Sequence, residues 1–330
     1  MLYYLESPSH DPAFNLALEQ VVFDRLDRAH SYCMLWQNDN AVIVGKHQNT
    51  AAEINADYIS SHGVRVVRRL SGGGAVYHDL GNINFTFITG AGDSGTLDLS
   101  AFCQPVLDLL HRQGINAQCS GRNDMTIDGQ KFSGNSQYIK QGRVMHHGTI
   151  LYDSDLTVVS KALTPPEDKY VSKGLASVRS RVTNVRPHMP GQPPTPVFLA
   201  MLRTHLLQAY GMTPREFTEG ELAEAQWLRN EVYATWDWNF GASPAYQTVK
   251  KRRVEGVGTL EVHMDVENGV IRAIRFYGDY FSTEDPARLA ALLTGQRLEP
   301  GQLLPLLRDA GTDRCFVGLR PEDLVKVLVE

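Results

Sequence analysis

Apolar residues recur at two spacings along the chain, and together they predict a fold built from helices and strands. Repeats at every third or fourth position are typical of helices. The helices predicted in this way cover residues 11–29, 100–113, 155–162, 195–210, 285–293, 302–309 and 322–329. Asp11 and Thr195, each followed by proline, are the expected N-caps of two of them. Short β-branched runs and two-residue alternation are typical of strands. They predict strands at residues 41–44, 64–67, 82–88, 262–264 and 270–276.

Turn signals divide the chain further. Asp128-Gly129, Gln141-Gly142 and Asn268-Gly269 are dipeptides that favour tight hairpins. The residue pattern changes near residues 241–244, and the segment beyond them has its own predicted strands and helices. We therefore expect two domains, residues 1–245 and 246–330. Residues 164–194, rich in Pro, Lys, Arg and Ser, are long for a plain connection, and such loops often carry function.

Composition excludes several classes of protein. The 330 residues are 42% hydrophobic and 21% charged, and the net charge of -5 argues against a general nucleic-acid binder. The N-terminus has no signal-peptide pattern, and no apolar run is long enough to span a membrane. The four cysteines form no CxxC pair, which argues against structural zinc or a disulfide framework. We expect a cytoplasmic protein that binds neither nucleic acid nor membranes.

The most informative run is RRLSGGGAVYHDLGNIN, residues 68–84. Adjacent glycines let the backbone come close to a ligand, and their N–H groups can form a nest for an anion. Arg68 and Arg69 stand beside this nest, and guanidinium groups pair well with phosphate or carboxylate. Neither a P-loop nor a G-x-G-x-x-G motif is present, so the run predicts a phosphate-binding loop of another kind.

Other side chains are weaker candidates. Lys131 follows a hairpin turn, and Phe132 beside it is expected to anchor the strand on the opposite face. His146 and His147 face opposite ways on a strand, so they are poorly placed to share one metal. Ser71 with His78 suggests nucleophilic catalysis, but no nucleophile elbow frames the serine and no third group is evident. Two arginines in the long loop, Arg179 and Arg181, suggest a cover that closes over an anion.

In combination these motifs resemble the lipoate–protein ligase A family. The matching segments are RRLSGGGAVYHDLGN at 68–82, SGRND at 120–124, KFSGN at 131–135, HHGTIL at 146–151, SVRSRVTN at 177–184 and WDWNFG at 236–241. The resemblance implies an α+β fold of the class II synthetase type shared with biotin ligases. Its catalytic domain has a mixed β-sheet with flanking helices, and a small α+β domain follows at the C-terminus.

The resemblance also implies an activity. ATP activates lipoate to lipoyl-AMP, with release of pyrophosphate, and the lipoyl group then passes to a lysine of a carrier domain. Lys131 is the implied catalytic residue, contacting both the acyl carbonyl and the phosphate. The implied ATP- and adenylate-binding residues are Arg69, Gly74, Ala75, Val76, Tyr77, Asn123, Asp124, Lys131, Arg179 and Arg181. The implied lipoate-binding residues are Arg68, Ser71, Gly72, Gly73, Lys131, His147 and Gly148. No metal ligand is assigned.

The implied cofactors are ATP and Mg²⁺, with lipoate as substrate. The implied acceptors are the lipoyl domains of 2-oxoacid dehydrogenase E2 subunits and the glycine cleavage H protein, acted on by a monomer. Arg143, Lys140 and Lys173 are basic residues that we expect to steer an acidic carrier. An ammonium at Lys131 lowers the repulsion between carboxylate and ATP. Val42, Val44, Val76 and Phe85 are candidates to line an apolar slot for the lipoyl chain.

Several alternatives stay open at this point. An octanoyl- or lipoyl-amidotransferase of the same fold works without ATP through a cysteine thioester, and Cys119 is its candidate nucleophile. A biotin ligase is disfavoured because its GRGRxG-type loop is absent, and a non-catalytic lipoyl-AMP sensor is disfavoured by the presence of Arg69 and Lys131. His147 and Asp124 are candidate general bases for the transfer step. The choice between lipoate and octanoate is open.

Overall fold

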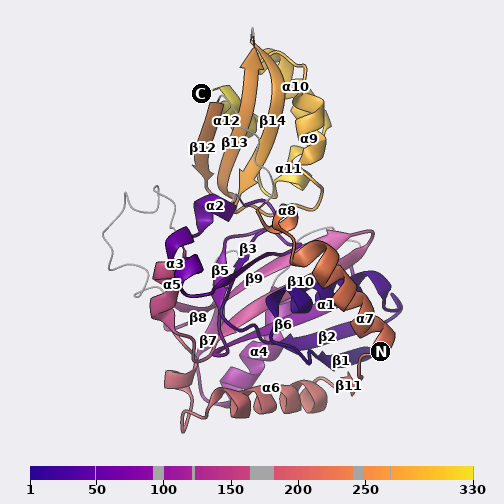
Figure 1. The fold of residues 1–330 in the computed structure, drawn as a ribbon, viewed down its shortest axis with the longest axis vertical. Coiled ribbons are helices and arrows are strands. Elements are labelled where there is room, and N and C mark those ends of the chain that lie inside the picture. The colour runs from indigo at the N-terminus through magenta and orange to yellow at the C-terminus, as the bar shows by residue number, and fades with distance from the viewer. Residues whose placement is uncertain are drawn as a thin grey trace.

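A computed structural model describes residues 1–48, 50–91, 100–120, 123–163, 182–240, 248–267 and 269–329. These residues form a large unit and a smaller C-terminal unit that stands on one end of it (Figure 1). Both units combine helices with sheet, as the sequence predicts. The predicted domain boundary at residue 245 lies outside the described residues, and so does the core of the predicted cover loop, residues 164–181.

The large unit is organised around a mixed sheet of eight described strands, in the order β11-β1-β2-β6-β10-β9-β8-β7. Their bounds are β1 Leu2–Glu6, β2 Ser31–Trp36, β6 Asn82–Gly90, β7 Ala117–Ser120, β8 Asp124–Ile127, β9 Gln130–Lys140, β10 Arg143–Leu151 and β11 Thr213–Pro214. β1 pairs in parallel with β2 and β11, whereas the pairs from β2 to β7 are antiparallel. The long antiparallel half explains why the sequence shows so many hairpin signals.

Both hairpin turns predicted in this half are present. Asp128 and Gly129 have φ values of 50° and 78°, and Gln141 and Gly142 have values of 50° and 70°. Positive φ at both central residues is the type I′ geometry, which matches the twist of the paired strands. The turns therefore set the register that brings Lys131 on β9 opposite Thr126 on β8.

A second, three-stranded sheet presents the glycine run. It consists of β4 Arg65–Arg68, β3 Ala41–Val44 and β5 Val76–His78. β3 pairs in parallel with β4 and antiparallel with β5. The glycine run is therefore the connection that carries the chain from β4 across β3 to β5, beside the main sheet.

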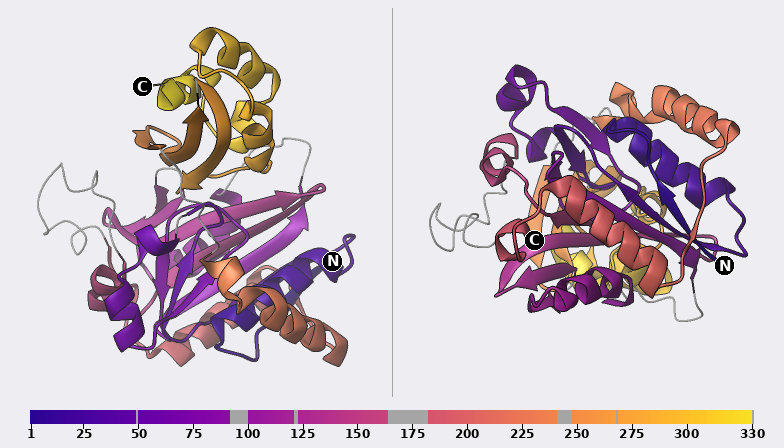
Figure 2. Two further views of the ribbon diagram at one scale, coloured as in Figure 1. Left: turned by 45° about the horizontal axis from the view of Figure 1, so that its top comes forward. Right: turned by 90° about the horizontal axis from the view of Figure 1, so that it is seen from below.

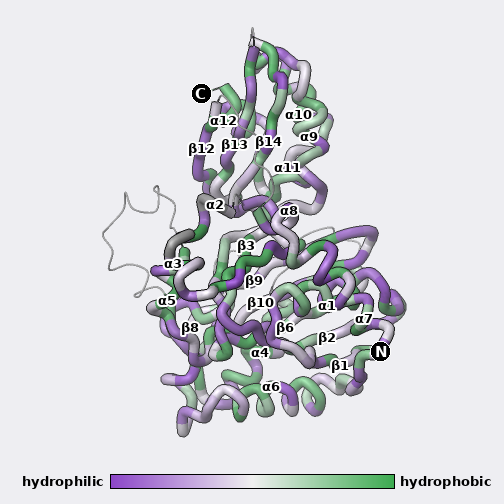
Figure 3. Tube along the Cα trace, in the orientation of Figure 1, coloured by the Kyte–Doolittle hydropathy of each residue, from purple (hydrophilic) through white to green (hydrophobic). Residues whose placement is uncertain are grey.

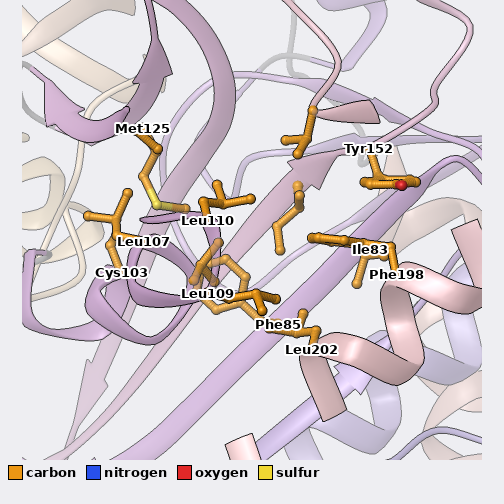
Figure 4. Packing of buried hydrophobic residues seen from close by; sticks show 14 of the residues in the cluster. Ile83, Phe85, Cys103, Leu107, Leu109, Leu110, Met125, Tyr152, Phe198 and Leu202 are labelled. Atoms are coloured by element: carbon orange, nitrogen blue, oxygen red, sulfur yellow. The ribbon is translucent and has the colours of Figure 1, made fainter. Parts of the chain in front are cut away.

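Helices cover the main sheet on both faces (Figures 1 and 2). α4 Ser100–Arg112 and α6 Thr195–Ala209 pack on one face, where a core cluster joins them to Phe85 and Ile83 of β6 (Figure 4). α1 Pro12–Arg25 and α7 Glu219–Leu228 pack on the other face, followed by a π-helical turn, η4 Arg229–Tyr233. Because the sheet is buried on both sides, even the polar residues of the alternating strand β6 are buried.

Shorter helices complete the large unit. They are α2 Thr50–Glu53, α3 Ala56–Ser61, α5 Leu156–Ala162, η3 Arg186–His188 and α8 Trp236–Asn239. α3 and α5 enclose a small apolar cluster with Val42, Val44 and Tyr77. This cluster fixes one edge of the small sheet that carries the glycine run.

The C-terminal unit has its own core. An antiparallel sheet in the order β12-β13-β14 packs against helices, and the two layers bury Leu260, Phe276, Leu307 and Phe316 between them. The bounds are β12 Thr248–Val254, β13 Gly258–Glu267, β14 Val270–Gly278, α9 Ala287–Leu293, α10 Pro300–Asp309, α11 Thr312–Cys315 and α12 Pro321–Val329. A separate core is what allows this unit to be an independent body on the large one.

The structure corrects some local expectations. The first helix ends at Arg25 rather than near residue 29, although Asp11 does cap it by accepting from the Ala13 N–H at 3.0 Å. α6 is capped at Pro194 without a side-chain hydrogen bond, so the expected cap at Thr195 is wrong. Arg143 is buried, donating to the Phe23 and Leu26 carbonyls at 2.5 and 3.0 Å, so it cannot steer a partner. No helix among the described residues is long and apolar enough to span a membrane.

Candidate active site

A pocket of about 460 Å³ lies where the glycine run, the β8–β10 hairpins and the C-terminal unit meet. Residues of β9 and β10 and of the run itself line it, together with two residues of the C-terminal unit. Its lining is Leu16, Trp36, Ile43, Arg69, Gly73, Gly74, Ala75, Val76, His78, Asn84, Asn123, Asp124, Lys131, Gly134, Asn135, Ser136, His147, Gly148, Thr149, Arg253 and Asp279.

Arg69 holds the glycine run from beneath. Its guanidinium donates to the carbonyls of Gly72 at 2.6 Å, Gly74 at 2.9 Å and Ile43 at 3.2 Å, and to Ser71 Oγ at 3.1 Å. Burial lowers the pKa of Arg69 to about 10, so the group is still charged at neutral pH. These hydrogen bonds hold the carbonyl groups of the run around the guanidinium, while Gly73 to Val76 line the pocket. Arg69 thus fixes the conformation of the glycine run.

The three glycines have three different surroundings. A Cβ on Gly72 would lie 2.4 Å from the Tyr280 carbonyl oxygen of the C-terminal unit, and Gly73 has φ +91° with the Phe281 ring close by. The Gly73 N–H donates to the same Tyr280 oxygen at 3.3 Å. Gly74 has nothing within 4 Å of its Cβ position and faces the pocket. Part of the glycine run therefore serves a protein contact.

Arg68 is committed to the scaffold. Its side chain donates to the carbonyls of Gly45, Lys46 and Gln48, to Thr50, and to the carbonyls of Trp238 and Asn239. Trp238 Nε1 donates back to the Arg68 carbonyl at 2.9 Å. The described part of the WDWNFG segment therefore clamps β4. The Arg68 guanidinium has these protein partners and is not part of the pocket lining.

A buried hydrogen-bond chain runs behind the pocket wall. Ser71 Oγ lies 2.6 Å from His147 Nε2, and His147 Nδ1 lies 2.9 Å from Glu19 Oε1. Thr86 donates to the same carboxylate at 2.6 Å and receives the indole N–H of Trp36 at 2.9 Å. In the tautomer in which Nδ1 donates to Glu19, Nε2 accepts the Ser71 O–H.

This chain revises the view of Ser71 as a nucleophile. Its histidine partner is His147 rather than His78, and a third group, Glu19, is present after all. Ser71 is nevertheless 1% exposed and accepts from Arg69, so no substrate can reach its oxygen. The serine, histidine and glutamate position Arg69 and the glycine run.

Lys131 projects into the pocket from β9. Its Nζ lies 2.6 Å from Asp124 Oδ1, and the two side chains are 37% and 34% exposed. The ammonium has room because Gly134 lacks a side chain, and a Cβ there would lie 3.1 Å from Nζ. Phe132, on the opposite face, is fully buried as the sequence predicts. The pair holds a positive charge at the pocket with a carboxylate beside it.

The end of the predicted cover loop meets the same strand. Val182 forms a parallel bridge with Lys131, and the Thr183 N–H donates to the Lys131 carbonyl at 2.9 Å. Arg179 and Arg181 lie outside the described residues. Val182 and Thr183, the first described residues after them, therefore contact the strand of Lys131.

The inner part of the pocket is more apolar. Leu16, Trp36, Ile43 and Val76 line it, together with the buried ring of His78. Of the residues proposed for an apolar slot, Val76 takes part. Val42 and Val44 instead pack with α3 and α5, and Phe85 packs in the core on the other face of the main sheet.

The structure brings most of the predicted site together. Ten predicted residues line the pocket: Arg69, Gly73, Gly74, Ala75, Val76, Asn123, Asp124, Lys131, His147 and Gly148. Tyr77 turns away and bonds Asn40, while Ser71 and Gly72 lie behind the wall. Their roles in binding stay predictions. Trp36, Arg253 and Asp279 were missed, because an isolated aromatic or a charge in a distant unit gives no local signal.

Comparison with known proteins matches both units. Residues 11–210 match the family model described as lipoyl protein ligase A/B catalytic domain, and residues 243–328 match the bacterial lipoate protein ligase C-terminus. Lipoate-protein ligase LplJ of Bacillus subtilis is 37% identical over 99% of this chain and 100% of its own. The chain belongs to the lipoate–protein ligase family.

Other relatives agree in sequence and in fold. Lipoate–protein ligase 1 of Staphylococcus aureus is 37% identical over 86% of this chain and 87% of its own length. LipL1 of P. falciparum, in complex with lipoate, has a TM-score of 0.80 at 24% identity, covering 100% of this chain and 99% of that one. A lipoate-protein ligase A bound with ATP has a TM-score of 0.62 at 25% identity, over 73% and 98% of the two chains. The fold is that of the lipoate ligases, as the motifs imply.

Buried histidines make acid lability a testable property of this ligase fold. Burial lowers the pKa of His47, His78 and His146 to about 3, well below the ordinary 6.5. Unfolding lets each ring bind a proton below its ordinary pKa, so the folded state loses stability as pH falls from about 6.5 toward 3. Each contributes a slope of about 1.4 kcal/mol per pH unit. Urea unfolding between pH 7 and pH 5 should show this loss. In a His146→Gln variant the slope of the free energy of unfolding against pH should be smaller by the contribution of about one proton. An unchanged slope would contradict the assignment.

The glycines offer a matched pair of variants. Gly72→Ala should loosen the C-terminal unit, because its Cβ would press on the Tyr280 carbonyl, while Gly74→Ala should not. Hydrogen exchange of peptides covering residues 276–282 measures this directly. We expect exchange at least about tenfold faster in Gly72→Ala, equivalent to about 1.4 kcal/mol of lost protection. Equal exchange in the two variants would rule out the docking role of Gly72.

Proposed function

We propose that this ligase activates lipoate with ATP to lipoyl-AMP and transfers the lipoyl group to a lysine of a carrier domain. The observation that carries the proposal is the position of Lys131, whose ammonium enters the same pocket as the backbone of Gly73 to Val76. One pocket thus offers a charged donor, a glycine-rich anion nest and an apolar inner part. The charged donor and the apolar part suit lipoate, which joins a carboxylate to a long apolar chain, and a glycine-rich nest suits the phosphates of ATP.

In the activation step, a lipoate carboxylate oxygen attacks the α-phosphorus of ATP and pyrophosphate leaves. Both reactants are anions, so bringing them together is the main obstacle. Lys131 reduces their repulsion and stabilises charge on the phosphorus, as preorganised donors do in other transfers. Orientation in such a pocket can supply roughly 7–11 kcal/mol of the barrier. No covalent enzyme intermediate is then required.

In the transfer step, the carrier lysine attacks the acyl carbonyl and AMP leaves. A lysine of pKa about 10.4 is about one part in 2,500 unprotonated at pH 7, so a base assists if one is near. Both ring nitrogens of His147 are engaged by Ser71 and Glu19. Asp124 lines the pocket and is partly exposed, so it is the better placed of the two candidates.

Support for the substrates comes from relatives. One similar structure is described as lipoate-protein ligase A bound with ATP, and LipL1 is described in complex with lipoate. An archaeal relative, 26% identical with a TM-score of 0.63, is described as a bipartite lipoate protein ligase with its E2 lipoyl domain. We infer that E2 lipoyl domains are acceptors here, with glycine cleavage H protein as a further one, and that the enzyme acts as a cytoplasmic monomer.

Mg²⁺ is the metal that the reaction implies. Such ions are commonly held by one or two carboxylates and the substrate phosphates. The two carboxylates in the pocket lining, Asp124 and Asp279, fit that donor type, although the described residues contain no cluster of three or more His, Cys, Asp or Glu side chains suited to a metal. When bound, the ion would neutralise charge on the leaving pyrophosphate.

Removing the ammonium tests the proposal. Lys131→Ala should lower lipoate-dependent AMP formation from ATP by about 10²–10³-fold, the usual cost of losing one charge-stabilising donor. Circular dichroism should be unchanged because the side chain is partly exposed. Lys140→Ala, at an exposed position of the same strand, is the matched control. Full turnover in Lys131→Ala would refute the assigned role, and no AMP from the wild-type protein would refute ATP activation.

The amidotransferase alternative has its own test. Burial raises the pKa of the Cys33 thiol, Cys103 and Cys315 are buried as well, and exposed Cys119 on β7 is outside the pocket lining. Cys119→Ala should therefore transfer lipoate at a rate within about twofold of the wild-type rate. An inactive but folded Cys119→Ala protein would favour the thioester mechanism.

A further inference from the structure

Three lysine or arginine side chains line the pocket, and they are not equally available to a ligand. They are Arg69, Lys131 and Arg253. Arg69 donates to three carbonyls and a hydroxyl of the scaffold, and Lys131 is paired with Asp124. Arg253 is exposed and has no ion-pair partner among the described residues. A guanidinium without an ion-pair partner, in a pocket proposed to bind anions, is a candidate ligand-binding group.

Arg253 comes from the C-terminal unit. It lies near the end of β12, a largely hydrophilic edge strand (Figure 3), and pairs with Thr259 of β13. Successive side chains of a strand face opposite ways, so Arg253 and Arg252 point to different sides. Lys250, on the side of Arg252, donates to the Leu328 carbonyl of α12. Arg253 accordingly faces away from α12, toward the pocket that it lines.

Specific contacts hold the C-terminal unit in this position. Besides the Gly73–Tyr280 hydrogen bond, the Gly278 N–H donates to the His47 carbonyl at 2.7 Å. His47 Nε2 lies 2.8 Å from Ser282 Oγ, and its ring stacks on Tyr280 with centroids 4.8 Å apart. Burial lowers the pKa of His47 to about 3, which keeps the ring neutral in the stack. The approach of Arg253 to the pocket therefore belongs to a built interface.

The chemistry of the pocket indicates which anion Arg253 takes. Lys131 is partly exposed and lies beside Asp124, whereas Arg253 is exposed and comes from the edge strand of the C-terminal unit. Asp279, the other charged residue from this unit, accepts the Thr259 N–H and is fixed by the β13–β14 geometry. A planar fork of donors suits phosphate oxygens. The polyphosphate of ATP is the anion of the proposed reaction that extends beyond the α-phosphorus.

We propose that Arg253 binds the phosphates of ATP, so that the C-terminal unit completes the nucleotide site for the activation step. This inference rests on the proposed function above. Arg253 is then a substrate-binding residue for activation. It takes no part in the transfer step, which follows the release of pyrophosphate. It adds a role for the C-terminal unit that the glycine run and Lys131 do not supply.

The test separates the two half-reactions. Activation is measured as lipoate-dependent exchange of pyrophosphate into ATP, and transfer as lipoylation of a lipoyl domain from synthetic lipoyl-AMP. Arg253→Ala should raise the KM for ATP at least about tenfold, the effect of losing one charged hydrogen bond. The KM for lipoate and the transfer rate from lipoyl-AMP should stay within about twofold. Arg253→Lys should fall between, because it keeps the charge and loses the fork.

Arg252→Ala, on the other side of the same strand, is the matched control and should keep the wild-type KM for ATP. A KM for ATP within about twofold of the wild-type value in Arg253→Ala would overturn the inference. An equal loss in both half-reactions would also overturn it, because it would show a general structural role. Absence of exchange in the wild-type protein would instead refute the proposed function, so the two failures are distinguishable.

Discussion

The whole site depends on one buried cation, the guanidinium of Arg69. It donates to the carbonyls of Gly72, Gly74 and Ile43, and these hydrogen bonds fix the glycine run to β3. A buried charge is costly unless it is fully hydrogen-bonded. Ser71 Oγ is the remaining acceptor for Arg69. Ser71 is hydrogen-bonded to His147, and His147 to Glu19, so the compensating carboxylate of Glu19 lies in the same interior. The conformation of the glycine run is therefore a consequence of how this cation is hydrogen-bonded.

The same run also couples the two units. Gly72 and Gly73 receive the Tyr280–Phe281 segment of the C-terminal unit, while Gly74 is left to the pocket. Backbone can approach backbone this closely because the side chains are missing. The same run therefore contacts both the pocket and the C-terminal unit.

Local patterns in the sequence predicted helices, strands and the hairpin turns, whereas the class II synthetase fold and the placement of Lys131 beside the glycine run followed from the family resemblance. It misjudged residues whose role is set by distant partners. Arg68, next to Arg69 in sequence, was expected to bind an anion, yet its side chain donates to carbonyls of α8. Arg143 reads as surface charge, yet it is buried beneath α1. The Ser71–His147–Glu19 chain joins residues separated by 76 and 128 positions, and Arg253 comes from another unit. No spacing rule connects such residues.

A crystal structure with a non-hydrolysable lipoyl-AMP analogue would show whether an acyl-adenylate occupies the pocket between the glycine run and Lys131. The phosphate-like group should lie within hydrogen-bond distance of Lys131 Nζ and of backbone N–H groups in residues 74–76. The lipoyl chain should run toward Leu16, Trp36 and Ile43. An analogue bound elsewhere, or with its phosphate-like group remote from Lys131, would rule out this assignment.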